Sequence, residues 1–419
     1  MSFARSLLVL SWFLAIGAQG LAQVPEPPSA PQDVRDEITR LREELDTLHR
    51  TYEARLASLE ARLAASEQSS VQTVAAVPPG AAGTGGPEGT LPVYGNVTAL
   101  SKIFNPDIAA IGNFLAAAGT NPVEPTPAFD LQEVETSLQA VVDPYARADF
   151  FLAFGPEGID IEEAYITFPT LPAGFLMKAG KMRSAFGKVN TMHNHVLPWA
   201  DRPLVTTNLL GGEEGIAGAG VSLARLLPNP WIFLEATGEV SHGDSELFRS
   251  PDSKALTYFG RLRAYQDVTE SSNVDLGASG AYGSNGVTTN STSRMFGLDA
   301  TFRYRPLKRA IYRRLLARTE LVWSRRTEIG GPAAFGAYVA TDYQFARRWF
   351  AGVRLDRAAR ATDPMASDSG VAGLLTFWPS EFSQVRSQYR RTKYSEGAVA
   401  NEVLVQLLFS IGAHGAHAF

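Results

Sequence analysis

The chain has 419 residues, of which 45% are apolar and 19% are charged, so it is long enough and apolar enough to fold into a sizeable domain. Its net charge of -5 lacks the basic excess of nucleic-acid-binding proteins, and we expect no nucleic-acid partner. There are no cysteines, which excludes thiol catalysis, disulfides, cysteine-ligated zinc and a lipidated N-terminal cysteine.

The N-terminal residues have the pattern of a secretory signal peptide. A cation, Arg5, precedes an apolar run from Leu7 to Ala18, and small residues follow with a cleavage point after Ala22. The run is too short for a transmembrane helix, and no later stretch is long and apolar enough for one. We therefore expect residues 1–22 to be a signal peptide rather than a buried helix, and any membrane-spanning part to consist of strands.

A proline-rich linker, residues 23–32, leads into a segment rich in Glu, Arg, Leu and Ala. Apolar residues recur there with the spacing of a heptad seam interrupted by one stutter: Ile38, Leu41, Leu45, Leu48, Tyr52, Leu56, Leu59 and Leu63. So narrow a stripe buries little in a monomer. We expect an α-helical coiled coil over residues 33–68 that self-associates as a dimer or a trimer; the alternative is a helix lying on its own domain. Residues 69–92, rich in Gly and Pro, predict a flexible linker.

Residues 93–419 predict a transmembrane antiparallel β-barrel, so that the fold class is all-β after the helical segment. About sixteen segments alternate apolar and polar side chains, each near the length at which a tilted strand crosses a bilayer. In one of the clearest, Phe296 and Leu298 share a face and Asp299 and Arg303 share the other. One face suits lipid and the other suits water.

The connections between these strands alternate in length. Those after even-numbered strands are short, apart from the basic "PLKRAIYRR", and those after odd-numbered strands are long, apart from "GPEG". The long ones are expected at 117–128, 183–214, 241–255, 281–293, 358–370 and 392–400. Outer-membrane barrels have short periplasmic turns and longer outer loops. The segment 183–214 follows the fifth strand and, as in general porins, is expected to fold into the barrel and narrow its pore.

Two motifs beside this segment resemble the phosphate-selective porin family of bacterial outer membranes. They are "GKMRSAFG" and "DRPLVTTNLLGGEEGIAGAGVSL", with a looser likeness in "VAGLLTFWPSEFSQVRSQYR" and in the last strand. The resemblance implies a sixteen-stranded, trimeric channel with a preference for anions such as phosphate. The family favours a row of basic residues along its channel, whereas the predicted interior of this chain is mixed in charge.

The end of the fifth strand and the segment after it carry charges that a loop inside a wet barrel would present to the pore. We expect basic residues to face acidic ones in a constriction made of Lys181, Arg183, Lys188, Arg202, Glu213 and Glu214. The alternative is that these side chains anchor the loop to the barrel wall through salt bridges.

Strand alternation also points charged side chains of the wall into the barrel. The predicted pore lining is Arg147, Asp149, Lys178, Arg261, Arg263, Arg303, Arg305, Arg354, Arg386 and Arg390, with Arg314 and Arg318 oriented alike and Glu133, Glu135, Glu235 and Glu239 on the first half. Opposite charges on opposite walls would set a transverse field that orients dipolar solutes. Alternatively, the charges pair with one another and stiffen the wall.

His193 and His195 would present two imidazoles on one side of an extended segment, a spacing that can bind zinc or copper. Two ligands are an incomplete site, and nothing in the sequence brings a further one, such as Asp201, His414 or His417, to them. We therefore predict hydrogen bonding within the loop and no metal or other cofactor. Motifs of serine hydrolases, P-loop enzymes and zinc proteases are absent from the sequence, and we predict no enzymatic activity.

Together these features predict an outer-membrane porin through which small hydrophilic solutes or ions diffuse passively. The alternative is an outer-membrane receptor or uptake channel for a metal ion or chelate such as zinc. The expected partners are outer-membrane lipid and lipopolysaccharide, the barrel assembly machinery and further copies of the chain, with a trimer favoured. The coiled coil is expected in the periplasm, where the cell wall is another candidate partner.

Overall fold

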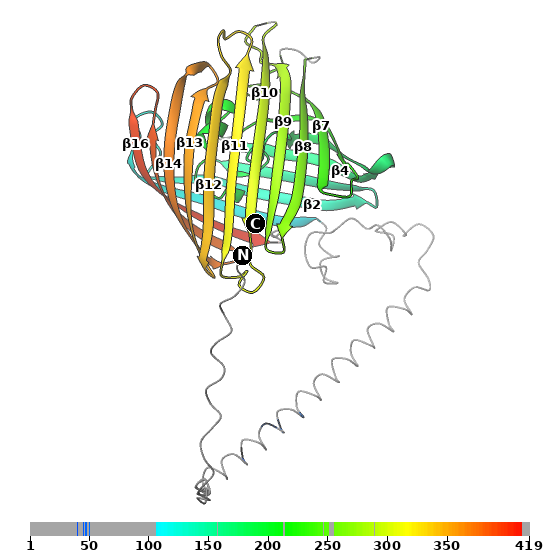
Figure 1. Cartoon of the computed structure of the whole chain (residues 1–419), viewed down its shortest axis with the longest axis vertical. Helices are drawn as coiled ribbons and strands as arrows, with labels where there is room; N and C mark the ends of the chain where they lie inside the picture. The colour runs from blue at the N-terminus through cyan, green and yellow to red at the C-terminus, as the bar shows by residue number, and fades with distance from the viewer. Residues whose placement is uncertain are drawn as a thin grey trace, which may run out of the picture. The chain divides into compact units, whose positions relative to one another are not determined.

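The computed structural model describes residues 106–412, apart from 157, 213, 246, 251–254 and 289, together with Arg40, Leu45, Thr47 and Arg50, which are helical (Figure 1). The signal peptide, both linkers and the rest of the predicted coiled coil lie outside the described residues, so these domain boundaries stay predictions. Among the described residues, no helix is both long enough and apolar enough to cross a membrane.

In the described part of the chain, sixteen antiparallel strands form one closed barrel (Figure 1). Each strand pairs with its neighbours in the chain, and the barrel closes where β1 pairs with β16. The strands are β1 Asp107–Thr120, β2 Phe129–Asp143, β3 Ala146–Gly155, β4 Gly158–Leu171, β5 Phe175–Arg183, β6 Ala217–Leu226, β7 Phe233–His242, β8 Leu256–Thr269, β9 Ser272–Ser284, β10 Thr292–Tyr304, β11 Arg314–Arg326, β12 Ala334–Ala346, β13 Trp349–Arg360, β14 Asp363–Ser380, β15 Ser383–Lys393 and β16 Val399–Gly412, with a 3-10 turn η1 Pro172–Gly174 before β5. The predicted all-β barrel and its strand number are confirmed, and closure leaves no sheet edge, as lipid requires.

The last strand, β16, shows how the sequence specifies the two faces of the wall. Val403, Val405 and Leu407 are 46%, 38% and 40% exposed, whereas Leu404 and Gln406 between them are each 1% exposed. Successive side chains of a strand point to opposite faces. The exposed face is therefore apolar, which is the composition that a lipid-facing surface needs.

The hairpin between β13 and β14 corrects the predicted loop pattern. A long polar connection was expected over 358–370, but β13 ends at Arg360 and β14 begins at Asp363. Arg360 donates to the Asp368 carboxylate across the hairpin at 3.2 Å, and Asn208 donates to the same carboxylate at 2.8 Å. The Asp, Ser, Gly and Pro residues of this stretch have loop-like local preferences, but these contacts between distant parts of the chain hold them in strands.

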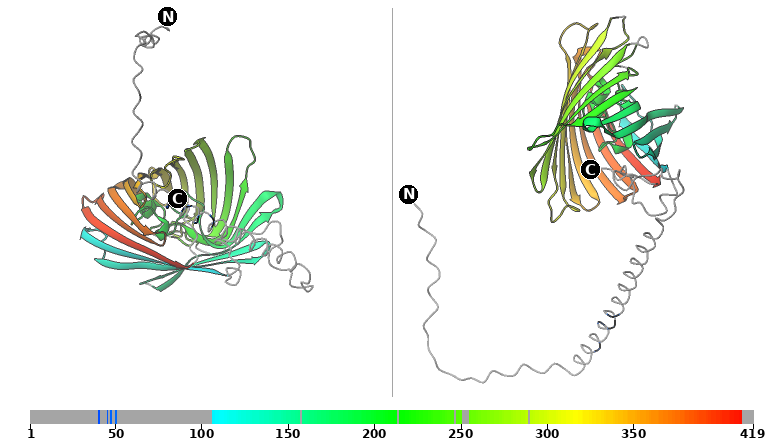
Figure 2. Two further views of the ribbon diagram at one scale, coloured as in Figure 1. Left: turned by 90° about the horizontal axis from the view of Figure 1, so that it is seen from below. Right: turned by 90° about the vertical axis from the view of Figure 1, so that its right-hand side faces the viewer.

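The segment between β5 and β6, residues 184–216, lies inside the barrel and is called the insert below (Figures 1 and 2). It contains a 3-10 turn η2 (Asn194–Val196) and a short helix α2 (Leu204–Leu209). Buried apolar side chains of the insert pack on the inner face of β9 to β14: Phe186, Val189, Leu197, Trp199, Val205, Leu209, Leu210 and Ile216. Since burying one such side chain contributes roughly 1.5–3 kcal/mol, the insert is a packed part of the fold.

Small residues on the wall make room for α2. A Cβ on Gly336 of β12 would meet Leu209 Cδ1 at 2.8 Å and Val205 Cγ2 at 2.9 Å, closer than such contacts normally come. Beside this seat, the rings of Trp199 and Tyr338 meet edge to face, with centroids 5.2 Å apart. This part of the inner wall is therefore apolar, unlike the water-suited inner face that strand alternation predicts.

Candidate functional site

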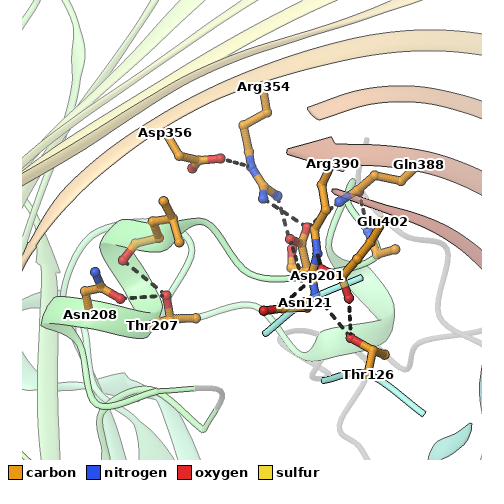
Figure 3. Close-up of polar contacts among 12 residues, drawn as sticks. Asn121, Thr126, Asp201, Thr207, Asn208, Arg354, Asp356, Gln388, Arg390 and Glu402 are labelled. Atoms are coloured by element: carbon orange, nitrogen blue, oxygen red, sulfur yellow. Dashed lines mark hydrogen bonds and ion pairs between the residues drawn. The ribbon is translucent and has the colours of Figure 1, made fainter. Parts of the chain in front are cut away.

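Asp201, which lies in the insert before α2, is held by side chains of β13 and β15 (Figure 3). Arg354 Nη2 lies 2.9 Å from Asp201 Oδ1, and Arg390 Nη1 lies 3.0 Å from Oδ2. Gln388 donates to Oδ1 at 2.6 Å, and Arg354 has a second carboxylate partner in Asp356. Burial disfavours the ionised carboxyl, but the two guanidinium groups outweigh it and hold the pKa of Asp201 below its usual value.

The same network reaches the loop between β1 and β2. Arg390 Nε donates to Glu402 of β16 at 2.8 Å, and Glu402 also accepts from Asn121 at 3.1 Å and from Thr126 at 2.8 Å (Figure 3). Charge-assisted hydrogen bonds of this kind are stronger than neutral ones. The insert, this loop and three strands are thus joined by one set of polar contacts.

The first part of the insert is held on β9 and β11. Lys188 Nζ lies 3.0 Å from Asp275, and the backbone N–H groups of residues 188 and 189 donate to the Glu320 carboxylate. Burial of the ammonium lowers the pKa of Lys188, although Asp275 opposes the shift. Gly187 has a φ of 60° and a side chain there would collide with Glu320, so only glycine fits this close approach.

On the other side of the insert, His193 and His195 meet glutamates of β2 and β4. His193 Nδ1 lies 2.9 Å from Glu135 and 2.7 Å from Glu162, and its Nε2 lies 2.8 Å from Glu163. His195 Nδ1 lies 3.0 Å from the same oxygen of Glu135. Burial of the ring opposes protonation, but the surrounding carboxylates raise the pKa of His193 well above its usual value.

Two residues predicted in the constriction make contacts that stabilise the insert. Arg183 is 4% exposed at its side chain, and its guanidinium lies 3.0 Å from Glu162 and donates to the carbonyl of Glu214 at 2.6 Å. Arg202 is buried and donates to Asn194 Oδ1 at 3.0 Å and to two carbonyls of the insert. The contacts of Arg183 join the wall to the insert, as the anchoring alternative describes, whereas those of Arg202 lie within the insert.

The remaining predicted constriction residues do not join a common site. Lys181 lies beside Ala219 on the outward face of β5, with its Nζ 3.5 Å from the exposed Asp160. The prediction that Lys181 faces the pore is wrong, because β5 pairs with β6 up to Arg183 and places Lys181 on the same outward face as Ala219. Glu214 is exposed, and Glu213 lies outside the described residues.

Many cations of the predicted pore lining are paired on the inner face. The ion pairs are Arg147–Asp149, Arg261–Asp299, Arg263–Asp275, Arg303–Asp275, Arg354–Asp356 and Arg390–Glu402. Lys178 Nζ lies over the ring of Tyr165, 4.3 Å from its centroid. Since paired charges exert little net long-range field, these contacts favour the pairing alternative over a transverse field.

A cavity of about 280 Å³ lies beside the insert, near the connections that follow β10 and β14. Its charged lining is mostly basic: Arg303, Arg305, Arg314, Arg318 and Arg386, with Asp342 and Glu381 as the acidic members. The Nε and Nη1 atoms of Arg318 have no hydrogen-bond partner among the described residues. The cavity therefore carries an excess of positive charge, part of which is available to a ligand.

A second cavity, of about 370 Å³, lies at the end of the barrel where the longer loops are. It is lined by the loop between β1 and β2, by Asp201 and Arg202 of the insert, and by Arg354 and Arg390 of the wall. The insert thus contributes to both cavities, and charged side chains line each of them. The second cavity is mainly polar, whereas the first combines its charged side chains with many apolar ones, such as Leu197, Leu316 and Phe382.

The wall carboxylates that hold the insert were not identified from the sequence. They are Glu162, Glu163, Asp275 and Glu320. Strand alternation could have found Asp275 and Glu320, but not both Glu162 and Glu163, which are consecutive in β4 at a register shift in its pairing with β3. Which part of the insert meets each of them depends on the register and closure of distant strands, which local patterns do not specify.

No protein-family model matches the chain. An uncharacterized protein of Aquifex aeolicus is 31% identical over 335 residues, which cover 70% of this chain and 70% of that protein. Among solved structures, the anion-selective porin from Comamonas acidovorans has a TM-score of 0.52 at 9% identity and covers 73% of this chain and 99% of its own. Pseudomonas putida OprB has a TM-score of 0.50 at 10% identity, covering 73% of this chain and 94% of its own. The likenesses to these two solved structures are likenesses of fold.

Proposed function

We infer that this chain, which belongs to the same protein family as the Aquifex aeolicus relative and has the fold of outer-membrane porins, is a passive diffusion channel. The outer face of its barrel is apolar. Two cavities in its interior are lined in part by the insert and in part by charged side chains of the wall. A wall of this kind in the outer membrane separates a wetted lumen from lipid. The channel acts on no covalent bond and passes small hydrophilic solutes or ions.

We further propose that the channel prefers anions, of which phosphate is one candidate. The observation that carries this proposal is the cavity lined by five arginines and two acidic residues. The Nε and Nη1 groups of Arg318, which have no hydrogen-bond partner among the described residues, can donate to a chloride or a phosphate oxygen. Selectivity in wide pores depends on the charge of the lining and the width of the narrowest part. The insert narrows the lumen beside this cavity.

The selectivity is tested by reversal potentials in planar bilayers under a potassium chloride gradient. We expect the wild type to favour chloride, and an Arg305→Gln/Arg318→Gln variant to lose most of that preference, with the chloride-to-potassium permeability ratio falling several-fold toward about one. Phosphate should reduce the chloride current of the wild type more than that of the variant, because it competes for the same guanidinium groups.

The matched control is Arg357→Gln/Arg391→Gln, which removes the same charge from exposed positions on outward faces of β13 and β15. This control should keep the wild-type reversal potential. A cation-selective wild type would contradict the anion preference. An equal change of the chloride-to-potassium permeability ratio in the lining variant and in the control would contradict it as well.

We propose that the coiled coil over residues 33–68 lies in the periplasm and holds several barrels together as a trimer, in contact with lipopolysaccharide through the barrels. Deleting residues 33–68 should leave the conductance of each barrel unchanged and convert oligomers into monomers on native gels. The reason is that the seam buries its apolar stripe only between chains. Oligomers that survive the deletion would mean that the helix is a spacer, for example one that reaches the cell wall.

A further inference from the structure

Four side chains from three segments of the chain meet on one side of the insert. Glu135 belongs to β2, Glu162 to β4, and His193 and His195 to the insert. Their side chains are between 2% and 10% exposed. The ligand atoms of Glu135, His193 and His195 all lie within 4.8 Å of one another. Imidazole nitrogens and carboxylate oxygens are thus gathered in a place largely closed to solvent.

The atoms that converge are those that a metal ion would use. Glu135 Oε2 lies 2.9 Å from His193 Nδ1 and 3.0 Å from His195 Nδ1, and Glu162 Oε2 lies 2.7 Å from His193 Nδ1. Ligands bonded to a tetrahedral zinc at about 2.0–2.1 Å are themselves about 3.3 Å apart. Each of these three distances would lengthen by a few tenths of an ångström around a bound ion.

The donor types select one class of ion. Two imidazole nitrogens with two carboxylate oxygens suit a divalent transition metal, of which zinc accepts such a set in tetrahedral geometry. Calcium and magnesium prefer ligands that are all oxygen. The chain has no cysteine, so a site for zinc has to be built from histidine and carboxylate.

A second layer of contacts orients these ligands. Glu163 Oε2 lies 2.8 Å from His193 Nε2, which holds the ring with its Nδ1 toward Glu135 and Glu162. Metal-binding histidines commonly donate their other ring nitrogen to a carboxylate in this way. Arg183 in turn holds the two glutamates in place: its guanidinium contacts Glu162, and its backbone N–H donates to Glu163.

The charges at this place are out of balance without a further cation. Glu133 adds another carboxylate; it is 6% exposed, and its Oε1 has no hydrogen-bond partner among the described residues. With Glu135, Glu162 and Glu163 it makes four carboxylates, against which Arg183 and a protonated His193 supply two positive charges. Buried carboxylates in excess of cations are costly. A divalent ion would offset that cost.

We propose that Glu135, Glu162, His193 and His195 bind one zinc ion, which joins the insert to β2 and β4. Glu163 positions His193 without binding the ion. The contacts of Asp201 and Lys188 attach the insert to β13, β15, β9 and β11, and the zinc would add an attachment to β2 and β4. The proposal concerns how the insert is held and stands whether or not the barrel passes anions.

The test uses the full chain, prepared without a polyhistidine tag, refolded in detergent and stripped with a chelator. We expect one zinc per chain by elemental analysis after titration and gel filtration, and a tetrahedral visible spectrum when cobalt(II) replaces zinc. A His193→Ala/His195→Ala variant should bind no stoichiometric zinc. Glu163→Gln should keep the site but weaken it by about 10- to 100-fold, the usual effect of losing such a positioning contact.

The matched control is His414→Ala/His417→Ala, which removes two histidines from the C-terminal residues and should keep one zinc per chain. Zinc binding that both double variants retain, or that both lose, would overturn the proposal, as would a wild type that binds no zinc. If the His193/His195 variant does not fold, proteolysis of the wild type decides: zinc must slow cleavage between residues 188 and 196, because an ion that binds the folded form stabilises it. Cleavage at an unchanged rate would exclude the site.

Discussion

Replacing residues 187–212 with a short Gly-Ser turn should raise the single-channel conductance about two- to fivefold, because the lumen of a sixteen-stranded barrel is open to water unless a segment fills it. The insert buries apolar side chains against β9 to β14 and carries charged contacts to the wall. Its removal leaves the pairing of β5 with β6 intact. The variant should therefore still close, which heat-dependent gel mobility would verify, and conductance is then measured in planar bilayers.

A second variant approaches the same question without changing chain length. Val205→Asp with Leu209→Asp places two charges against the apolar seat of α2 and should release the helix, again raising conductance. Shortening residues 286–290, in the loop between β9 and β10, is the control and should leave conductance as it was. A folded deletion variant with wild-type conductance would mean that ions do not pass beside the insert.

Asp201→Ala should loosen the insert by roughly 3–5 kcal/mol, the usual cost of removing one partner from a buried ion pair. Arg354 and Arg390 both lose a carboxylate, and Arg354 is 3% exposed, so water does not readily replace it. Hydrogen exchange followed by mass spectrometry measures the effect. Amides in residues 188–210 should exchange about 100-fold faster or more, because exchange follows the population of the opened form.

Acid should reproduce this loosening in the wild type. The pKa of Asp201 is held below its usual value, so its contribution is complete above the ordinary aspartate pKa of about 3.9 and is lost as the pH falls through the lower, folded value. Exchange in the insert, corrected for its intrinsic pH dependence, should therefore accelerate below about pH 4. The Asp201→Ala variant should lack this step, whereas Asp143→Ala, at the exposed end of β2, should keep it. A step that persists without Asp201 would assign the acid response to other groups.

The outer face of the barrel could be predicted from the sequence because it depends on local alternation alone. Val403, Val405 and Leu407 needed no knowledge of any partner, since lipid is the same beside every strand. Strand number and the order of short and long connections follow from the same pattern, apart from the hairpin after Arg360. There the contact that decides is with Asn208, about 150 residues earlier in the chain.

The interior was harder to predict because it contains two kinds of surface. The inward face of β11 to β14 is apolar where α2 packs on it. Both faces of these strands are therefore apolar there, and the alternation of apolar and polar residues does not distinguish the inner face from the outer one. The roles of the charged side chains of the wall depend on their partners, which strand alternation does not identify. Arg354 faces inward as predicted, but its carboxylates come from the insert and from its own strand.

Lys181 shows the sensitivity of such predictions to where a strand ends. It was grouped with the charges of the loop in one constriction, whereas it belongs to β5, which pairs with β6 up to Arg183 and turns Lys181 outward. Arg183, two positions later, is turned by contacts with Glu162 and the carbonyl of Glu214 instead of by alternation. A strand end that moves by a few residues therefore changes the role of each charged side chain near it.

The strands that contact the insert range from β2 to β15, so the insert can pack fully only after nearly all strands are in place. No early fragment of the chain contains all of them, so the interior can settle only after the first and last strands have met. Until then the incomplete sheet exposes both its apolar outer face and the inner face against which the insert later packs. A chain stalled at that stage exposes both surfaces and is prone to aggregate.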